Sequence, residues 1–238
     1  MGWSKDIASN GEYWYCEGMS CFPKIMELEY SRLKNLLNEE QIFAAMLELK
    51  DVLELTIKLP VIMEMALCLN DKKKSIQMND GEIYAIMLNG PLSLGKWIQI
   101  ANRLKAKKTG NDILKSILQE VSNRYINSCI ARKSFDVAKW RNGRIGHGAL
   151  ASENNEQVRP EIEELLLVLK AYWENTKELY SKIKLCYVVN NKEIVLSESD
   201  ISNDKIEIWL KNMSENVFSP MSPFVECING KLYLFDSL

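Results

Sequence analysis

The chain has 238 residues, of which 47% are hydrophobic and 26% charged, with 30 basic against 32 acidic side chains and one histidine. A chain of this size and composition can bury a substantial core, which excludes disorder as a global description. A single histidine excludes metal centres that need two or three imidazoles and leaves His147 as the only imidazole for acid–base chemistry. The net charge of −2 gives no overall basic footprint for nucleic acid, although a local one stays open.

The six cysteines include no two pairs at metal-ligand spacing, so we expect buried thiols, no metal or other cofactor, and a reducing, cytoplasmic compartment. No secretory signal opens the chain, and no apolar run approaches the roughly 18 residues of a membrane-spanning helix. The sequence therefore predicts no membrane partner.

Residues 1–22 are expected to form an irregular leader, and residues 23–184 a helical body. Apolar residues recur at three-and-four spacing from Pro23 to residue 70, which is typical of helix. Pro60 lies inside this run and is predicted to kink or divide it, because proline lacks the amide donor that the helix needs.

Four further helices are predicted, over residues 81–88, 92–107, 113–140 and 160–183. Asn111 or Asp112 is placed to cap the third of them. A loop with three glycines, residues 142–156, precedes the last helix, which Pro160 is expected to open.

The pattern changes after Lys184, and residues 185–238 are predicted to form a small antiparallel β segment. The β-prone runs are residues 185–189, 194–196, 206–210, 223–228 and 231–235. Turn sequences separate the first two and the last two, which predicts two hairpins. The expected fold is therefore mainly α, an up-and-down helical bundle followed by a small antiparallel β segment, α+β overall. The last strand ends almost at Leu238, and two interpretations stay open: a piece of a longer protein whose next elements complete this sheet, or a natural C-terminus on a strand.

The segment over residues 140–150 carries the clearest chemistry. Arg141 has a planar fork of donors that suits phosphate oxygens, and Asn142 adds an amide donor and acceptor. His147 can give or take a proton near neutral pH. Small glycines on both sides of it allow a polymer backbone to come close. The combination suits phosphodiester cleavage, with the arginine on the phosphate and the histidine moving the proton of a 2′-hydroxyl or of the leaving oxygen.

The window from Arg132 to His147 is locally basic. It holds five basic residues and one acidic residue, a net charge of +4, which leaves −6 for the other 222 residues. Such an island is a phosphate-binding footprint of limited size. We therefore predict that Arg132, Lys139 and Arg144 bind RNA or phosphate around the three central residues.

Alternatives remain open for these side chains. His147 has a structural alternative as a loop residue that hydrogen-bonds the backbone, and a third role in binding nucleotide or RNA without cleavage. Arg141 has an alternative as a cation that stabilises a helix C-terminus. Three acidic residues fall at three-residue intervals on the predicted helix from Gln41, and this face either supplies an acidic partner for Arg141 or His147 or is an ordinary polar surface. They are Glu48, Asp51 and Glu54.

Arg141-Asn142, four residues and then His147 resemble the Arg-Asn-x-x-x-x-His signature of HEPN domains. The Gly-His-Gly context and the leucine-rich helix that follows extend the likeness over roughly residues 24–184. The resemblance implies a bundle of four to five helices that forms a homodimer, and a metal-independent endoribonuclease whose composite site brings Arg, Asn or Asp, and His from two subunits face to face. Carried onto this chain, Arg141 contacts phosphate, Asn142 orients phosphate or ribose, and His147 is the acid–base group.

The leader and the β segment lie outside a minimal HEPN domain, and the β segment weakly resembles linker regions of multidomain bacterial defence proteins. The expected partners are RNA, a second copy of the chain, and further domains or an antitoxin or regulatory partner. The expected setting is anti-phage defence or the toxin of a toxin–antitoxin pair. The alternative is a non-catalytic dimerisation or ligand-sensing module, because many HEPN domains lack nuclease activity.

Overall fold

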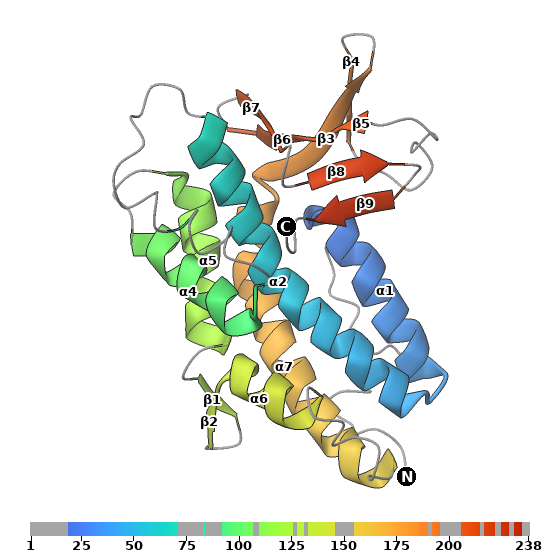
Figure 1. The fold of residues 1–238 in the computed structure, drawn as a ribbon. Coiled ribbons are helices and arrows are strands. Elements are labelled where there is room, and N and C mark those ends of the chain that lie inside the picture. The colour runs from blue at the N-terminus through green and yellow to red at the C-terminus, as the bar shows by residue number, and fades with distance from the viewer. Residues whose placement is uncertain are drawn as a thin grey trace.

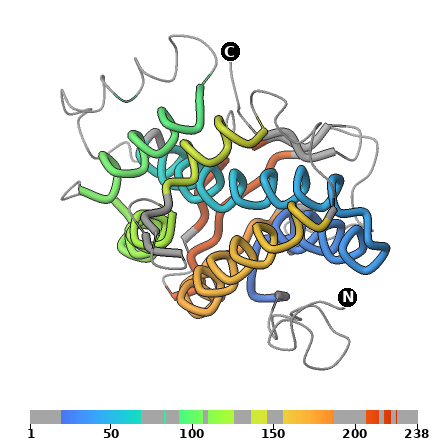
Figure 2. Tube along the Cα trace, turned by 90° about the horizontal axis from the view of Figure 1, so that it is seen from below, coloured from blue at the N-terminus to red at the C-terminus, as the bar shows by residue number. Residues whose placement is uncertain are grey.

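A mainly helical body carries antiparallel strands at one end in the computed structural model (Figure 1). The structure describes residues 19–70, 83, 92–106, 110–125, 128–130, 133–145, 155–189, 192–195, 206–214, 217–221, 225–228 and 231–234. The helices are η1 (Met19–Cys21), α1 (Lys24–Asn38), α2 (Ile42–Asn70), α4 (Leu94–Ala106), α5 (Asp112–Tyr125), α6 (Val137–Arg144) and α7 (Asn155–Tyr180). α2 lies at the centre of the body and contacts α1, α4, α5 and α7 (Figure 2). The mainly α, α+β class predicted from the sequence is confirmed.

The strands form one hairpin beside α6 and two larger sheets. They are β1 (Ser128–Ile130), β2 (Lys133–Phe135), β3 (Ile183–Val189), β4 (Lys192–Val195), β5 (Ile206–Glu207), β6 (Trp209–Asn212), β7 (Val217–Pro220), β8 (Val225–Ile228) and β9 (Lys231–Leu234). The sheet orders are β4-β3-β6-β7 and β5-β8-β9, and all pairs are antiparallel. The hairpins β3–β4 and β8–β9 are the two that the turn sequences predict. The single strand expected over residues 206–210 is divided between β5 and β6, which belong to different sheets.

The sheets and the helices share one hydrophobic core. Side chains at most 3% exposed connect them, namely Ile183, Leu185, Leu210, Met221 and Val225. The predicted change from helix to strand after residue 184 falls inside β3, because α7 already ends at Tyr180. The β segment therefore covers apolar surface of the bundle, and burial of that surface stabilises both parts.

The sequence predicts that Pro60 kinks or divides the long helix, and the structure shows that it does not divide it. α2 is continuous from Ile42 to Asn70 with Pro60 inside it, and the chain breaks earlier, between α1 and α2, where Glu40 has a positive φ of 55°. Residues 59–66 of α2 are all buried. Tertiary packing on nearly every side of this segment outweighs the lost backbone hydrogen bond.

A buried tyrosine supplies the hydrogen bond that Pro60 cannot make. In a regular helix the amide at position 60 would donate to the carbonyl of Thr56, four residues earlier. Here the Tyr172 hydroxyl of α7 donates to that carbonyl at 3.2 Å, and it lies 3.0 Å from the Tyr180 hydroxyl. Burial raises the pKa of both phenols well above the usual range, so they stay neutral in the core.

The helix predicted over residues 113–140 is interrupted. α5 ends at Tyr125, the β1–β2 hairpin follows with the register Ile130↔Lys133 at its turn, and α6 begins at Val137. Asp136 has an extended backbone, and its carboxylate accepts the backbone N–H of Lys139 at 2.9 Å. This side chain is an N-cap, and it starts a separate helix at a point where the apolar period alone predicts continuation.

The last helix begins five residues before the predicted start. α7 runs from Asn155, with Pro160 inside it rather than at its opening. Residues 146–154 of the predicted glycine-containing loop, with His147 among them, lie outside the described residues. So do residues 1–18 of the leader and the predicted helix over residues 81–88, apart from Ile83, which is helical and buried.

The start of α5 is tied to α2 through a buried carboxylate. Asn111 caps the helix as predicted, with its Oδ1 accepting the backbone N–H groups of Ile113 and Leu114 at 3.0 Å each. The Asn111 backbone N–H donates to Glu64 of α2 at 3.2 Å. Gly110 has a φ of +119°, and a Cβ there would clash with the Glu64 carboxylate.

Among the described helices, none combines the length and apolarity needed to cross a bilayer.

Candidate phosphate-binding site on α6

α6 is a short helix with an inner and an outer face. Val137 on the inner face is fully buried, and Trp140 packs against the core. Lys139 and Asn142 lie on the outer, exposed face. An isolated helix of eight residues would not be stable in water, so tertiary contacts must hold α6 in place.

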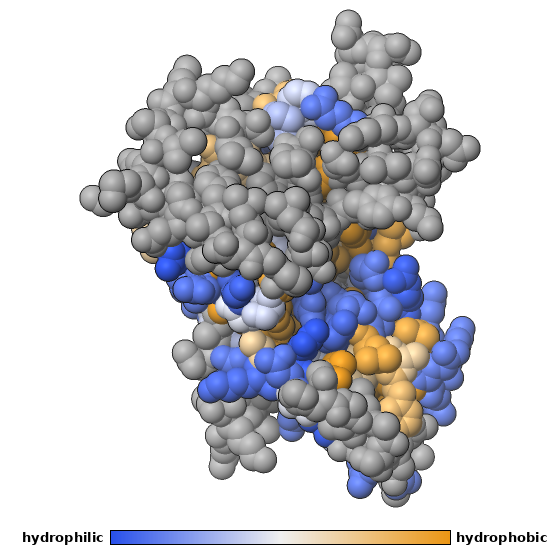
Figure 3. Space-filling model, viewed as in Figure 1, coloured by the Kyte–Doolittle hydropathy of each residue, from blue (hydrophilic) through white to orange (hydrophobic). Residues whose placement is uncertain are grey.

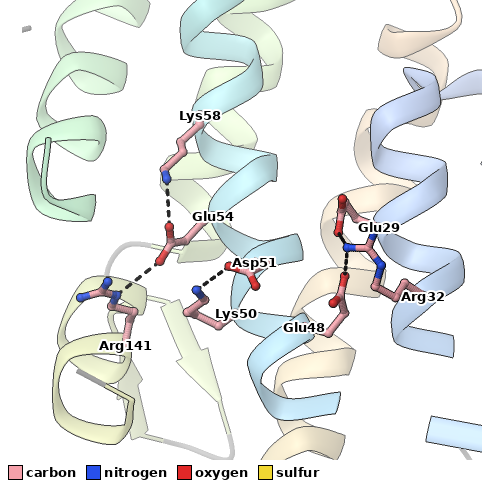
Figure 4. A network of polar contacts seen from close by, with 8 residues as sticks. All are labelled: Glu29, Arg32, Glu48, Lys50, Asp51, Glu54, Lys58 and Arg141. Carbon is pink, nitrogen blue, oxygen red and sulfur yellow. Dashed lines mark hydrogen bonds and ion pairs between the residues drawn. The ribbon is translucent and has the colours of Figure 1, made fainter. Parts of the chain in front are cut away.

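Arg141 reaches from α6 across to α2, where it meets Glu54 (Figure 4). Its Nε donates to Glu54 Oε1 at 3.3 Å, and Lys58 Nζ lies 3.0 Å from Glu54 Oε2. The Glu54 and Lys58 side chains are only 13% and 17% exposed, whereas Arg141 is 39% exposed. One carboxylate thus lies between two cations, and the arginine is the cation that solvent reaches best.

Asn142 completes the polar contacts of the guanidinium. Its Oδ1 accepts a hydrogen bond from Arg141 Nη1 at 3.2 Å. Because the amide oxygen faces the arginine, the Asn142 NH₂ group is directed away from it. In the part of the chain that the structure describes, Glu54 and Asn142 engage Nε and Nη1 of Arg141. Arg141 is thus part-exposed and Asn142 is exposed, so both side chains offer donors at the surface of α6.

A second side of α6 is held by α7 through Glu161. The Arg144 Nε donates to Glu161 Oε2 at 2.8 Å and to Oε1 at 3.0 Å, and Arg144 Nη2 also contacts Oε2. The indole N–H of Trp140 donates to Glu161 Oε1 at 2.8 Å. Arg144, predicted as a phosphate-binding residue, is therefore already paired with a carboxylate within the chain.

The three acidic residues of α2 do not share one role. Glu54 contacts Arg141, whereas Glu48 faces α1, where Arg32 Nη1 lies 3.6 Å from its Oε1 and 2.9 Å from Glu29 Oε2 (Figure 4). Asp51 contacts the neighbouring Lys50. The interpretation of this face as a source of an acidic partner for Arg141 is thus confirmed for Glu54.

The structure brings together some of the predicted site residues and says nothing of others. Arg141 and Asn142 are in contact, Lys139 is exposed on the same helix, and Arg144 is held by Glu161. His147 and Arg132 lie outside the described residues.

Sequence reasoning missed two residues of this arrangement, Lys58 and Glu161. Lys58 stands four residues after Glu54, the spacing of a helical ion pair, and that signal was available in the sequence. Glu161 had no such signal, because it lies 17 residues after Arg144 on another helix.

The site offers anion binding rather than a cage for a cation. Among the described residues, no group of three or more His, Cys, Asp or Glu side chains is placed to hold a metal ion. A guanidinium and an amide on one surface, flanked by Lys58, suit a phosphate group with a single negative charge.

An apolar surface lies near the site on the first half of α2. Phe43 and Leu47 are 36% and 46% exposed and lie four residues apart, so they are neighbouring exposed apolar side chains on one face of α2. Figure 3 shows hydrophobic surface over this half of α2, bordered by hydrophilic residues. Leu47 precedes Glu54 by seven residues, or about two helical turns, so both lie on nearly the same side of α2.

Comparison of the chain with protein-family models, with curated proteins and with solved structures finds no match at a significant level.

Proposed function

We propose that the protein is a metal-independent endoribonuclease of the HEPN type, which cleaves RNA in a composite site formed by two copies of the chain. The observation that carries the proposal is the placement of Arg141. Its guanidinium is part-exposed, is held at Nε by the part-buried Glu54, and stands on the helix that ends just before the segment containing His147. A guanidinium fixed at one edge is pre-organised to receive a phosphate at its remaining donors.

The proposed reaction is attack of a ribose 2′-hydroxyl on the adjacent phosphorus. Neutral His147 accepts the proton of the 2′-hydroxyl as the O2′–P bond forms. The P–O5′ bond breaks, and a protonated imidazole donates a proton to the leaving 5′ oxygen. Arg141 stabilises the negative charge that builds up on the non-bridging oxygens, and the Asn142 amide orients the phosphate or the ribose. The products are a 2′,3′-cyclic phosphate and a 5′-hydroxyl.

The test is cleavage of labelled RNA by the purified chain and its variants. Loss of a proton-transfer group costs about 10²- to 10⁴-fold in rate, so His147→Ala is expected to lose nearly all activity with the fold intact. Arg141→Lys keeps the charge but loses the fork of donors, and is expected to lose most of the activity as well. Asn142→Ala removes the amide that orients the phosphate or ribose, and is expected to lose part of the activity.

The matched control is Lys170→Ala, which removes an exposed cation from α7 away from α6. We expect it to cleave at the wild-type rate. RNA with a single 2′-deoxy substitution at the cleavage position is expected to resist cleavage, and EDTA is expected to have no effect. Full activity of His147→Ala, or loss of activity in EDTA, would contradict the proposed mechanism.

A second candidate function is a non-catalytic module that holds two chains together or senses a ligand. The exposed Phe43 and Leu47 favour it, because apolar side chains at this exposure on one helix face are typical of protein contacts. This candidate predicts a stable dimer that cleaves no RNA and is unaffected by His147→Ala. Sedimentation together with the cleavage assay distinguishes the two.

A further inference from the structure

We propose that Glu161 is a positioning residue for the reaction, because it sets the rotation of α6 and thereby the direction in which Arg141 presents its guanidinium. The inference rests on the proposed function and deepens it. It adds a residue that touches neither RNA nor the reacting atoms, and that lies on a different helix from the sequence motif.

Few apolar contacts hold α6. Of its eight residues, only Val137 at the first position is buried. Ala138 and Trp140 are partly buried against the core, and the four residues after Trp140 are polar or lack a side chain, including the exposed Gly143. Hydrophobic packing therefore holds the first half of α6, and polar contacts hold its second half.

Glu161 of α7 contacts two side chains of α6. Its carboxylate takes the indole N–H of Trp140 and two nitrogens of Arg144, which stand four residues apart and so lie on one side of α6. A carboxylate that hydrogen-bonds to both side chains resists rotation of the helix about its axis. Its two oxygens are part-buried between α6 and α7, where charge-assisted hydrogen bonds are stronger than at an open surface.

The contacts of Glu161 also bear on the direction of Arg141. Arg141 directly follows Trp140, about 100° further round the helix, and points to α2. Glu161 on α7 and Glu54 on α2 thus hold α6 from two sides. Without Glu161, Trp140 and Arg144 would both lose this carboxylate, and α6 could turn about its axis and move Arg141 relative to Glu54.

The experiment measures cleavage kinetics and the protection of α6 from hydrogen exchange in the 238-residue chain. A displacement of about 1 Å at a catalytic group costs on the order of 10²-fold, so Glu161→Ala is expected to lower kcat by about 10- to 100-fold, with KM changed by less than about threefold. Hydrogen exchange should become faster in the peptide that covers α6 and stay the same in α1 and α4.

The conservative variant is Glu161→Gln, whose amide oxygen still accepts from Trp140 Nε1 and Arg144 Nε. Its kcat is expected to be at least about fivefold higher than that of Glu161→Ala. Trp140→Phe keeps the ring packing but removes the indole donor, and is expected to lower kcat to a smaller extent in the same direction. The control is Glu164→Ala, which removes an exposed carboxylate one turn further along α7 and should change neither kcat nor exchange.

Three outcomes would overturn the positioning role. They are an unchanged kcat in Glu161→Ala, a loss of protection over the whole chain rather than in α6, and equal loss in Glu161→Gln and Glu161→Ala. If the wild-type chain cleaves no RNA, the proposed function fails. The exchange of α6 in Glu161→Ala against Glu164→Ala then still decides whether Glu161 holds this helix.

Discussion

At the scale of single residues, the helical repeat explains why one of three similar carboxylates belongs to the site. Residues three apart on a helix are rotated by about −60°, so Glu48 and Glu54 point about 120° apart. Glu54 consequently faces α6 and Arg141, and Glu48 faces α1 and Arg32. The sequence shows the spacing of these carboxylates but not which neighbour each one meets, because that depends on how α1 and α6 pack around α2.

Glu48 gives a prediction about pH and stability. Burial, with a smaller contribution from the neighbouring Glu29, raises the pKa of Glu48 from its ordinary 4.5 to about 7, against the opposing effect of Arg32. The folded chain then holds this proton between pH 4.5 and 7 while the unfolded chain releases it. The free energy of unfolding therefore falls as the pH rises through this window, by about 3 kcal/mol from this group.

Glu48→Gln removes the ionisation and with it this pH dependence. The unfolding free energy of the variant minus that of the wild type is expected to be about 2–3 kcal/mol larger at pH 8 than at pH 5. Urea unfolding at the two pH values measures it, with Glu164→Gln as the exposed control. Equal effects of Glu48→Gln at both pH values would show that Glu48 is ionised throughout the range.

At the scale of elements, the sequence predicts one of two capped helix starts. Asn111, one of the two candidates for the start of α5, is the cap, but the Asp136 cap of α6 is not predicted because apolar residues keep a four-residue spacing from Ile113 to Cys129. Likewise, the sequence predicts that Pro60 kinks or divides a helix and that Pro160 opens one, whereas both lie inside continuous helices. Local propensity cannot report the tertiary contacts that override it.

The pairing of Pro60 with Tyr172 can be tested by a double-mutant cycle. Tyr172→Phe leaves the Thr56 carbonyl buried without its donor, which is expected to cost about 1–3 kcal/mol of unfolding free energy. In the Pro60→Ala background the amide of residue 60 can donate to that carbonyl, so the same substitution should cost about 1 kcal/mol less. Urea unfolding of the four proteins measures the coupling.

Tyr125→Phe is the control for this cycle. Tyr125 is equally buried, and within the described residues its hydroxyl has no hydrogen-bond partner, so its removal is expected to be neutral or slightly stabilising. A coupling energy of zero between Pro60 and Tyr172 would mean that the Tyr172 hydroxyl matters only through Tyr180.

At the scale of the whole molecule, the sequence predicted an α bundle followed by strands, but it did not predict how closely the two are joined. The β-prone runs alternate too briefly to show which face is buried, and the covering of the bundle by the sheets depends on contacts between distant segments. Met221 and Val225, for example, join a core that includes α2 residues more than 150 positions earlier. The Arg141–Glu54 pair, 87 residues apart in sequence, is fixed by the same packing.

The final prediction concerns the proposed composite site, which requires two chains to meet on the face that carries α6. Leu47 is exposed on that face of α2, two turns from Glu54. Leu47→Glu places a charge in the proposed contact and is expected to shift the protein from dimer to monomer, with about tenfold or greater loss of cleavage at equal chain concentration. Analytical ultracentrifugation and the cleavage assay measure the two effects.

Leu167→Glu serves as the matched control, since Leu167 is 52% exposed on α7. It should leave both the dimer and the activity unchanged. Because the site would be shared between subunits, the activity lost by Leu47→Glu should return at high protein concentration, whereas that of Arg141→Lys should not. A fully active monomeric Leu47→Glu variant would show that one chain holds the complete site, and that Arg141 needs no second copy to bind and cleave RNA.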